Sequence, residues 1–506
     1  MRIVLVLFKT IRMEGKQVII IGAGIGGLTT AVRLLKKGYN VRILEKNKQA
    51  GGRLNKIEKD GFTFDAGPSF FSMSYEFKEF ADQCGIELPF EYEALDPLYV
   101  VNMPNGRQFH LYKDPEKLAR EFEDLEPGFA EKLRRYLDSG RKLFESSMPA
   151  IIKQNHPTLA SYLKALMQSP PQQVGKLFRN FYQEVSRYFD AEETRAIISL
   201  VSFFLGRSPF QTSAIYTLLS YMEFEHDGYY NVKGGMYKIV EGLVKTIDEL
   251  GGTFDYETDI TQVVSADGRV DHLIDAEGKS YKADIYVCNA DAATFRGQML
   301  HRAAFSEERL DRMNWTFAPL TIYLGVEGKV ENLNHHNYFL GTNYKGYATG
   351  IFTNQITLEK PYYYVNVLSH SNKECAPEGK EALFIVCPMP DLRYKKDWGD
   401  TDVIVENIIA DLSERIQTPL KERIVSKTVL NPVDWQKMFH LHRGSGLGLA
   451  HDIMQIGYFR PGNVDEELSN LYYVGASTVP GTGLPMCLIG SGLVTERIVD
   501  RSGAPF

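Results

Sequence analysis

The fold is decided by one stretch near the N-terminus, Val18-Ile19-Ile20-Ile21-Gly22-Ala23-Gly24-Ile25-Gly26-Gly27. Its β-branched start predicts a short buried strand. Residues 28–37 follow with apolar side chains at helical spacing, and a second apolar run at residues 41–44 ends in Glu45. Strand, glycine-rich turn, helix and strand in this order predict a βαβ unit. The expected fold class is therefore α/β with a Rossmann-like parallel sheet.

Each glycine of this turn has a physical role in binding a dinucleotide. Gly22 permits the tight turn, Gly24 lets the backbone approach a pyrophosphate, and Gly27 lets the helix pack closely on the strand. The N-terminus of the helix then faces the phosphates. Glu45 is placed to accept hydrogen bonds from ribose hydroxyls, and its charge would repel the 2′-phosphate of NADP. A glycine-rich turn without a ligand is the alternative.

A second glycine motif indicates which dinucleotide is bound. Gly51-Gly52-Arg53 comes shortly after Glu45, and Gly61-Phe62-Thr63-Phe64-Asp65-Ala66-Gly67-Pro68 follows it. At these residues the chain resembles the FAD-binding, amine-oxidase-like flavoproteins, and more narrowly the bacterial-type carotenoid desaturases. Arg53 would reach back to the phosphates of a tightly held cofactor, unless it is simply a solvated turn residue. The resemblance implies FAD.

The resemblance continues from about residue 13 to residue 503. Residues 231–291 predict a helix and several strands, which in the resembled family return to the FAD domain with Val263 beside the adenine. Residues 471–486 predict a strand, a glycine-rich turn and a last helix that close the flavin end. The candidate cofactor-binding residues are Gly22, Gly24, Gly27, Glu45, Gly52, Arg53, Gly67, Pro68, Val263, Gly475, Ala476, Pro485 and Met486.

Two positions depart from the family pattern. Val479 stands where members commonly have histidine, and Met486-Cys487 stands where glycine often follows the second proline. Both positions lie beside the flavin in the resemblance, so they put local flavin contacts and substrate preference in doubt. Cys487 lies in the general region of the cysteinyl-flavin link of some amine oxidases, but its neighbours do not match that motif. Non-covalent FAD is expected.

Composition narrows the class of protein. With 506 residues, 44% hydrophobic and 24% charged, the chain can build two domains. The five cysteines form no CxxC pair, which favours reduced thiols in a cytoplasmic protein and no metal site. No apolar run reaches 18 residues, so no membrane span is expected. Residues 1–12 are interpreted as an extra leader, a short strand or an anchor.

Charge is unevenly distributed along the sequence. Between Lys132 and Arg187, ten basic residues face three acidic ones, a balance of +7 in a chain of net charge −7. Aromatic and apolar residues at helical spacing accompany them, so this segment is a candidate surface for anionic lipid headgroups and peripheral membrane attachment. A solvated basic helical face is the alternative. Nucleic acid is disfavoured, because the rest of the chain would be repelled by phosphate.

The order of the motifs predicts a discontinuous architecture. The FAD-binding domain is expected to comprise residues 13–80, 230–300 and 440–506. A mixed α+β substrate domain would use residues 81–229, mostly helical, together with residues 301–439. The latter contain strand-like runs and a helix from about 403 to 416. The helical part would face the membrane.

The resemblance implies a reaction, but the residues identify no catalytic group. It implies removal of two hydrogens from a C–C bond adjoining a polyene, with electrons passed to oxygen or a quinone. Residues 65–73 look closer to enzymes that introduce a 3,4 double bond at the acyclic, 1-hydroxylated end of a C40 carotenoid. The alternatives are a phytoene desaturase, a C30 dehydrosqualene-type desaturase, a carotene isomerase or ketolase, another flavoenzyme on this scaffold, or a non-enzymatic prenyl-binding protein. Structural hydrogen bonding is expected for the acids near the motifs, Asp65, Glu223, Glu225 and Asp434.

Overall fold

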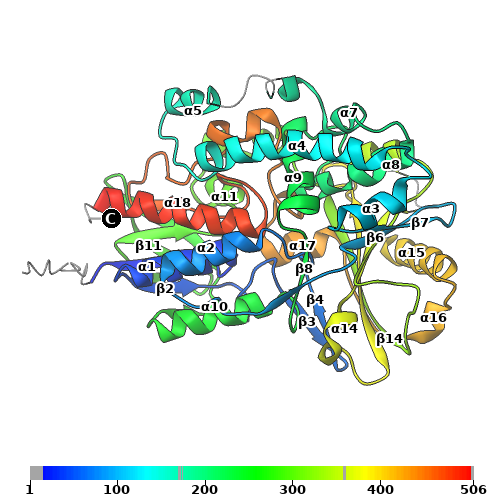
Figure 1. Ribbon diagram of the computed structural model, residues 1–506. Coiled ribbons are helices and arrows are strands. Elements are labelled where there is room, and N and C mark those ends of the chain that lie inside the picture. The colour runs from blue at the N-terminus through cyan, green and yellow to red at the C-terminus, as the bar shows by residue number, and fades with distance from the viewer. Residues whose placement is uncertain (1–14, 169–172, 174, 357–360, 503–506) are drawn as a thin grey trace, which may run out of the picture.

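The structure, a computed structural model, describes residues 15–168, 173, 175–356 and 361–502 (Figure 1). Residues 1–12, interpreted above as a leader or anchor, lie outside the described residues. A five-stranded sheet of order β19-β13-β1-β2-β9 and a seven-stranded sheet of order β18-β14-β17-β16-β15-β6-β7 form the two largest sheets. In Figure 1 the first lies on the left with α1, α10 and α18, and the second on the right with α15. The α/β class with a mixed second part is confirmed.

The five-stranded sheet is entirely parallel. Its strands are β1 (Gln17–Ile21), β2 (Asn40–Leu44), β9 (Thr253–Asp255), β13 (Ile285–Cys288) and β19 (Leu471–Tyr473). Because β1 is central and all strands run the same way, the carboxyl ends of β1, β2, β13 and β19 meet at one edge of the sheet. That edge is where open α/β sheets bind their ligands.

The β-branched run of β1 is buried on both faces of this sheet. Val18 and Ile20 pack with helices α1 (Ile25–Lys36), α10 (Lys238–Glu249) and α18 (Leu484–Ser502). Ile19 and Ile21 face the opposite way, toward a small antiparallel sheet of β10 (Ile260–Ala266), β11 (Arg269–Asp275) and β12 (Ser280–Tyr281). Alternate side chains of a strand point to opposite faces, so a parallel strand covered on both sides must be apolar throughout.

The seven-stranded sheet combines segments far apart in the sequence. Its centre contains β14 (Ala318–Glu327), β17 (Lys380–Met389) and β16 (Tyr363–Val367), with β18 (Ile424–Leu430) at one edge. At the other side β15 (His336–Phe339) pairs in parallel with β6 (Tyr99–Asn102), which pairs with β7 (Gln108–Leu111). Helix α15 (Thr401–Arg415) covers one face, close to its predicted bounds.

A layer of helices lies along the top of Figure 1. It contains α3 (Pro115–Phe122), α4 (Phe129–Ser147), α5 (Leu159–Leu166), α7 (Phe181–Val185), α8 (Glu192–Ile198) and α9 (Leu218–Tyr221). Helices α4 and α9 meet at Gly140, where a Cβ would lie 2.9 Å from the Thr217 carbonyl oxygen. In the described residues, no helix has the length and apolar character that crossing a bilayer requires.

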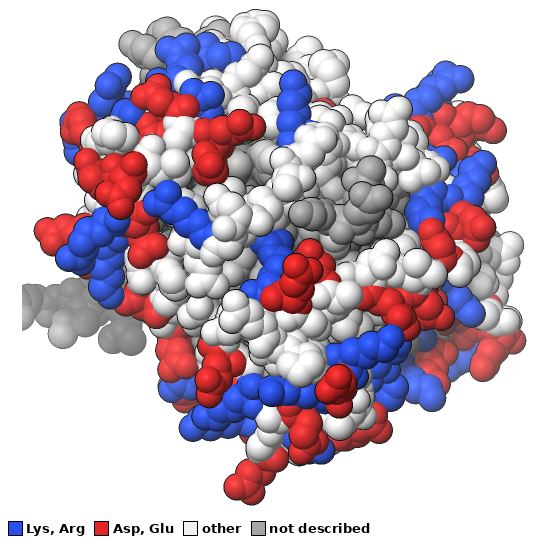
Figure 2. Space-filling view, turned by 90° about the vertical axis from the view of Figure 1, so that its right-hand side faces the viewer, with Lys and Arg blue, Asp and Glu red and all other residues white. Residues whose placement is uncertain are grey.

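The basic balance of the helical segment proves to be mostly neutralised. Eight of its ten basic side chains form ion pairs, several with acids outside the segment, such as Glu76 and Glu126. Lys176 is even buried, beside Glu184. Counting charge within a sequence window therefore overstated the free positive charge. Figure 2 likewise shows both signs interspersed over the face that it displays, around a largely uncharged middle.

Candidate functional site

One continuous cavity of about 1340 Å³ joins the two halves of the molecule. It begins at the carboxyl edge of the five-stranded sheet, against Gly22 and Glu45, and extends to Tyr338 and Tyr364 on the seven-stranded sheet. Its volume exceeds the usual range of about 300–1,000 Å³ for small-molecule sites. The cavity is therefore large enough for more than one ligand group.

The first glycine motif forms the floor of this cavity. Gly22 has a φ of +94°, which L side chains rarely adopt. At Gly27 a Cβ would lie 2.4 Å from the Gly22 carbonyl oxygen, so glycine is needed for the helix to pack on the strand. Helix α1 starts at Ile25 directly after Gly24 and directs its free N–H groups into the cavity. The geometry fits an anionic pyrophosphate.

The second glycine motif packs directly on the first. Gly51 donates its N–H to the Ala23 carbonyl at 2.8 Å, and a Cβ on Gly52 would lie 3.3 Å from the Gly24 Cα. Gly67 lies so close to the Arg53 carbonyl that a Cβ would be 1.9 Å from its oxygen. Gly52, Gly67 and Pro68 all line the cavity. The two motifs thus form one cradle with backbone exposed where side chains would otherwise fill the space.

Glu45 joins β2 to this cradle. One carboxylate oxygen accepts from the Ala23 N–H at 2.7 Å, and the other accepts from the Asn47 N–H at 2.8 Å. Burial raises the pKa of Glu45, and these hydrogen bonds oppose that shift. The side chain lines the cavity. Its role toward a ribose stays a prediction, and its role in holding the glycine turn is visible here.

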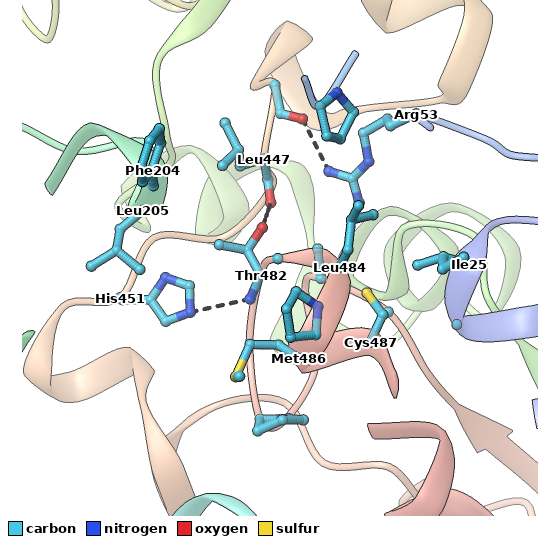
Figure 3. A pocket seen from close by; sticks show the side chains of 18 of the residues that line it. Ile25, Arg53, Phe204, Leu205, Leu447, His451, Thr482, Leu484, Met486 and Cys487 are labelled. Atoms are coloured by element: carbon cyan, nitrogen blue, oxygen red, sulfur yellow. Dashed lines mark hydrogen bonds between the residues drawn. The ribbon is translucent and has the colours of Figure 1, made fainter. Parts of the chain in front are cut away.

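Arg53 lines the cavity and also has a partner within the protein. Its Nη1 donates to the Gly446 carbonyl oxygen at 3.0 Å (Figure 3). The side chain therefore fastens the segment before Leu447 to the cavity wall, and its contact with the phosphates stays a prediction. Sequence spacing could not show the bond to Gly446, because the acceptor lies 393 residues away.

The C-terminal motif supplies a further part of the cavity wall. Gly475 and Ala476 follow β19, and helix α18 begins at Leu484, so that Pro485 and Met486 lie at its N-terminus. All four of the predicted residues in this motif, Gly475, Ala476, Pro485 and Met486, line the cavity. A second helix N-terminus is thereby directed at the space that the first one faces.

Val263 does not reach the cavity. It lies on β10 opposite Leu273, partly buried between the small sheet and the five-stranded sheet. The residues that line the cavity here are Thr258, Asp259 and Ile260, at the start of the strand. Val263 itself is not among the residues that line the cavity, and its contact with the adenine stays a prediction.

Several residues of the site were not predicted from the sequence. Asn289, at the polar end of β13, donates to the Gly22 carbonyl at 3.2 Å, and a Cβ on Gly24 would lie 2.6 Å from its Nδ2. The buried Arg460 donates to five main-chain carbonyls, which holds the loops around Leu449 and Ala476 together. The only signal in the sequence was a polar residue directly after a buried strand.

His451 and Thr482 form a further contact that was not foreseen. The His451 Nε2 accepts from the Thr482 N–H at 3.2 Å, while the Thr482 hydroxyl donates to the Leu447 carbonyl at 3.1 Å (Figure 3). Burial lowers the pKa of His451, so its imidazole is neutral and carries its proton on Nδ1. Both residues line the cavity near Met486.

Of the four acids near the motifs, one lines the cavity. Asp65 accepts from the Met236 N–H at 2.9 Å, and Asp434 closes a capping box with Asn431. Glu225 is exposed. Glu223 is buried in the cavity wall. Structural hydrogen bonding therefore accounts for Asp65 and Asp434. Glu223 bonds to the phenols of Tyr99 and Tyr229, but its Oε2 has no partner among the described residues.

The cysteines offer neither a disulfide nor a reactive thiolate. All five are buried and free. Cys487 lines the cavity, but burial raises the pKa of its thiol to about 11, which keeps it protonated. Within the described residues, no three His, Cys, Asp or Glu side chains gather as metal ligands would.

Comparison with known proteins identifies the family. Residues 25–498 match the family described as flavin containing amine oxidoreductase. The chain belongs to this family. A zeta-carotene-forming phytoene desaturase of Myxococcus xanthus is 34% identical, over 97% of this chain and 95% of that protein. A carotenoid 3,4-desaturase of Haloarcula japonica is 31% identical, over 96% of this chain and 99% of that protein.

The fold agrees with this assignment. The structure of an oxidoreductase from Methanosarcina mazei superposes with a TM-score of 0.62 at 16% identity, over 95% of this chain and 100% of that one, which shows a shared fold. The family assignment and FAD, both expected from the glycine motifs, are confirmed. This flavoprotein is an FAD-dependent oxidoreductase, so the non-enzymatic prenyl-binding alternative falls away.

Proposed function

We propose that this flavoenzyme is a carotenoid desaturase that introduces the 3,4 double bond at the acyclic, 1-hydroxylated end of a C40 carotenoid. The observation that carries the proposal is the cavity, which runs without interruption from the dinucleotide cradle into an aromatic interior. Such a shape suits a long apolar substrate better than a small amine. A relative named as a carotenoid 3,4-desaturase supports the choice of bond.

The reaction depends mainly on the shape of the cavity. Two neighbouring carbons each lose one hydrogen, one as a hydride and one as a proton, and the new π bond extends the polyene. FAD supplies the acceptor for the hydride, and oxygen or a quinone would take the two electrons afterwards. Aromatic residues such as Phe70, Phe204 and Tyr338 line the interior and exclude water. Since the polyene itself delocalises positive charge, alignment of one C–C bond is the main requirement.

A phytoene desaturase is the second candidate, favoured by the Myxococcus xanthus relative at 34% identity. We would express the chain in cells that make phytoene, lycopene or 1-hydroxylated acyclic carotenoids and follow the pigments by absorbance and mass. The proposal expects loss of two hydrogens and a red shift on the hydroxylated substrate alone. Coloured product from phytoene would favour the second candidate. Isomerisation without a change in mass would contradict desaturation altogether.

We further propose that the substrate enters from a bilayer through an apolar rim at the mouth of the cavity. The rim comprises the exposed residues Leu159, Leu163, Met167, Ile453, Met454, Tyr458 and Phe459. Contacts of Tyr162 with Tyr458 and Phe459 join its two segments. Ile453, Tyr458 and Phe459 are more than 40% exposed and also line the cavity. An exposed apolar patch continuous with an apolar cavity is a physical route for a water-insoluble molecule.

The rim shifts the expected membrane attachment from electrostatic attraction to insertion of apolar side chains. Attachment to an anionic surface was expected from the basic segment, but most of that charge is paired within the protein. Lys164 is exposed beside Leu163 and forms no ion pair with a described acid. We therefore propose insertion of the rim into the headgroup region, with a small electrostatic contribution from Lys164.

A further inference from the structure

Glu223 is a buried carboxyl group that neither the dinucleotide cradle nor the fold explains. It lies in the single turn η5 (Met222–His226), directly after α9, where the helical layer meets the seven-stranded sheet. Its side chain is 3% exposed and lines the cavity. A carboxyl group is an unusual wall for an otherwise apolar interior, because burying it without partners is costly.

This carboxyl group has hydrogen-bond partners, but one of its two oxygens has none within the described part of the chain. The phenols of Tyr99 and Tyr229 bond to it, whereas its Oε2 has no hydrogen-bond partner among the described residues. Burial raises the pKa of Glu223 to about 8, so the group is protonated at neutral pH. A protonated carboxyl group can donate a hydrogen bond, and Oε2 is the oxygen that no described residue engages.

The surroundings of this donor are aromatic. The ring centroid of Phe70 lies 4.8 Å from that of Phe204, 4.9 Å from that of Tyr229 and 6.1 Å from that of Tyr338. Phe70, Phe204, Tyr229 and Tyr338 all line the cavity with Glu223. Glu223 therefore presents its unpaired Oε2 in a part of the cavity wall that is otherwise formed by aromatic side chains.

We propose that Glu223 binds the hydroxyl of a polar end group carried by an otherwise apolar polyene substrate. The inference rests on the proposed function and names the residue that would select the hydroxylated substrate. A carboxylic acid can both donate to a hydroxyl oxygen and accept from its proton. A site built to hydrogen-bond a substrate hydroxyl discriminates strongly against an analogue without that hydroxyl. With the analogue bound, the polar group of the protein is left buried and unpaired.

The test uses the holoenzyme and two substrates with the same polyene, a 1-hydroxylated acyclic carotenoid and its hydrocarbon parent. Glu223→Met removes the polar group at similar volume, and Glu223→Gln keeps a donor and an acceptor. For the hydroxylated substrate, Glu223→Met should lower kcat/KM about tenfold or more, mainly through KM. For the hydrocarbon it should change kcat/KM by less than about twofold. Glu223→Gln should stay within about threefold of the wild type on both.

A matched control separates selectivity from stability. Glu126 is equally buried but lies outside the cavity, where it accepts from the Ala191 N–H and pairs with Lys132. Glu126→Gln should lower the melting temperature without changing the ratio of kcat/KM for the two substrates. FAD content, read from absorbance, shows that each variant keeps its cofactor.

The outcomes distinguish this inference from the function on which it rests. If Glu223→Met lowers kcat/KM equally for both substrates while FAD is retained, the end-group role is wrong and the desaturase proposal stands. A wild type with no preference for the hydroxylated substrate would also contradict the role of Glu223. If the wild type converts neither carotenoid, the proposed function fails and this inference fails with it.

Discussion

At the scale of single residues, glycine positions were predictable and their partners were not. Gly27 and Gly67 must lack side chains because a Cβ on either would lie within 2.4 Å of a carbonyl oxygen. The sequence indicated this, since local spacing encodes a turn. Asn289, which the cradle also needs, contacts Gly22 from 267 residues away. No local pattern predicts which distant side chain fills such a space.

The cradle makes Gly24→Val a sharp test of cofactor binding. The new side chain would project toward the pyrophosphate and also meet Asn289, since the Cβ alone lies 2.6 Å from its Nδ2. We expect flavin content to fall from about one per chain to a small fraction of that. Absorbance of the purified protein measures it. Gly399→Val, outside the cavity, should retain FAD, and a yellow, stoichiometric Gly24→Val variant would show that this turn does not hold the pyrophosphate.

Arg53 and Val263 are two residues whose contacts with FAD rest on the resemblance alone. Both contacts stay predictions: Arg53 lines the cavity and bonds to Gly446, whereas Val263 is not among the lining residues. In each case residues of the same segment line the cavity. The direction of one side chain depends on packing from elsewhere in the fold, which local sequence does not specify.

At the scale of elements, strong periodicity predicted well and short apolar runs did not. The strands β1, β14, β16 and β17 and the helix α15 lie close to their expected positions. Strands β6 and β7 were missed within a segment expected to be mostly helical. Each has only 4 residues, and a run of that length does not distinguish strand from helix. Strand β6 forms by pairing with β15, more than 200 residues later, and β7 forms by pairing with β6.

The crossing of α4 and α9 yields a prediction about stability. At Gly140 a Cβ would lie 2.9 Å from the Thr217 carbonyl oxygen and 3.1 Å from the Tyr221 Cβ. Gly140→Ala should therefore separate the helices and lower the free energy of unfolding by about 1–3 kcal/mol. Chemical denaturation measures the change. Arg135→Ala, on the exposed side of α4, should have little effect, and an equally stable Gly140→Ala would show that the crossing is looser than this geometry.

At the scale of the whole molecule, the net charge counted within one segment was the least reliable guide to the free charge on the surface. The basic segment has a balance of +7 when counted alone, but the fold brings Glu76, Glu79 and Glu126 to its lysines. A sequence window cannot include acids that arrive from other segments. Exposed apolar residues proved more informative, because eight of the twelve large ones in the described residues lie in residues 159–178 and 453–459. The membrane-facing side that we propose therefore rests on exposure and not on charge.

The apolar rim predicts how the protein should bind membranes. Leu163 and Phe459, which lie on its two segments, are 47% and 46% exposed. The double variant Leu163→Asp/Phe459→Asp would place charges where acyl chains are expected, so partitioning onto liposomes should fall on the order of tenfold. Cosedimentation measures it with FAD content as a check on the fold. Val425→Asp, a matched change at 46% exposure outside the rim, should leave partitioning unchanged.

Salt separates this mechanism from attraction between charges. If insertion of apolar side chains dominates, raising the ionic strength should weaken wild-type partitioning only slightly, since the Debye length affects exposed charges alone. Steep loss of binding with salt, together with normal binding by the double variant, would instead assign the surface to basic side chains. Because Phe459 also lines the cavity, the double variant should in addition slow conversion of a carotenoid supplied in liposomes more than one supplied in detergent. Equal loss in both would mean that the rim shapes the cavity without serving as its membrane contact.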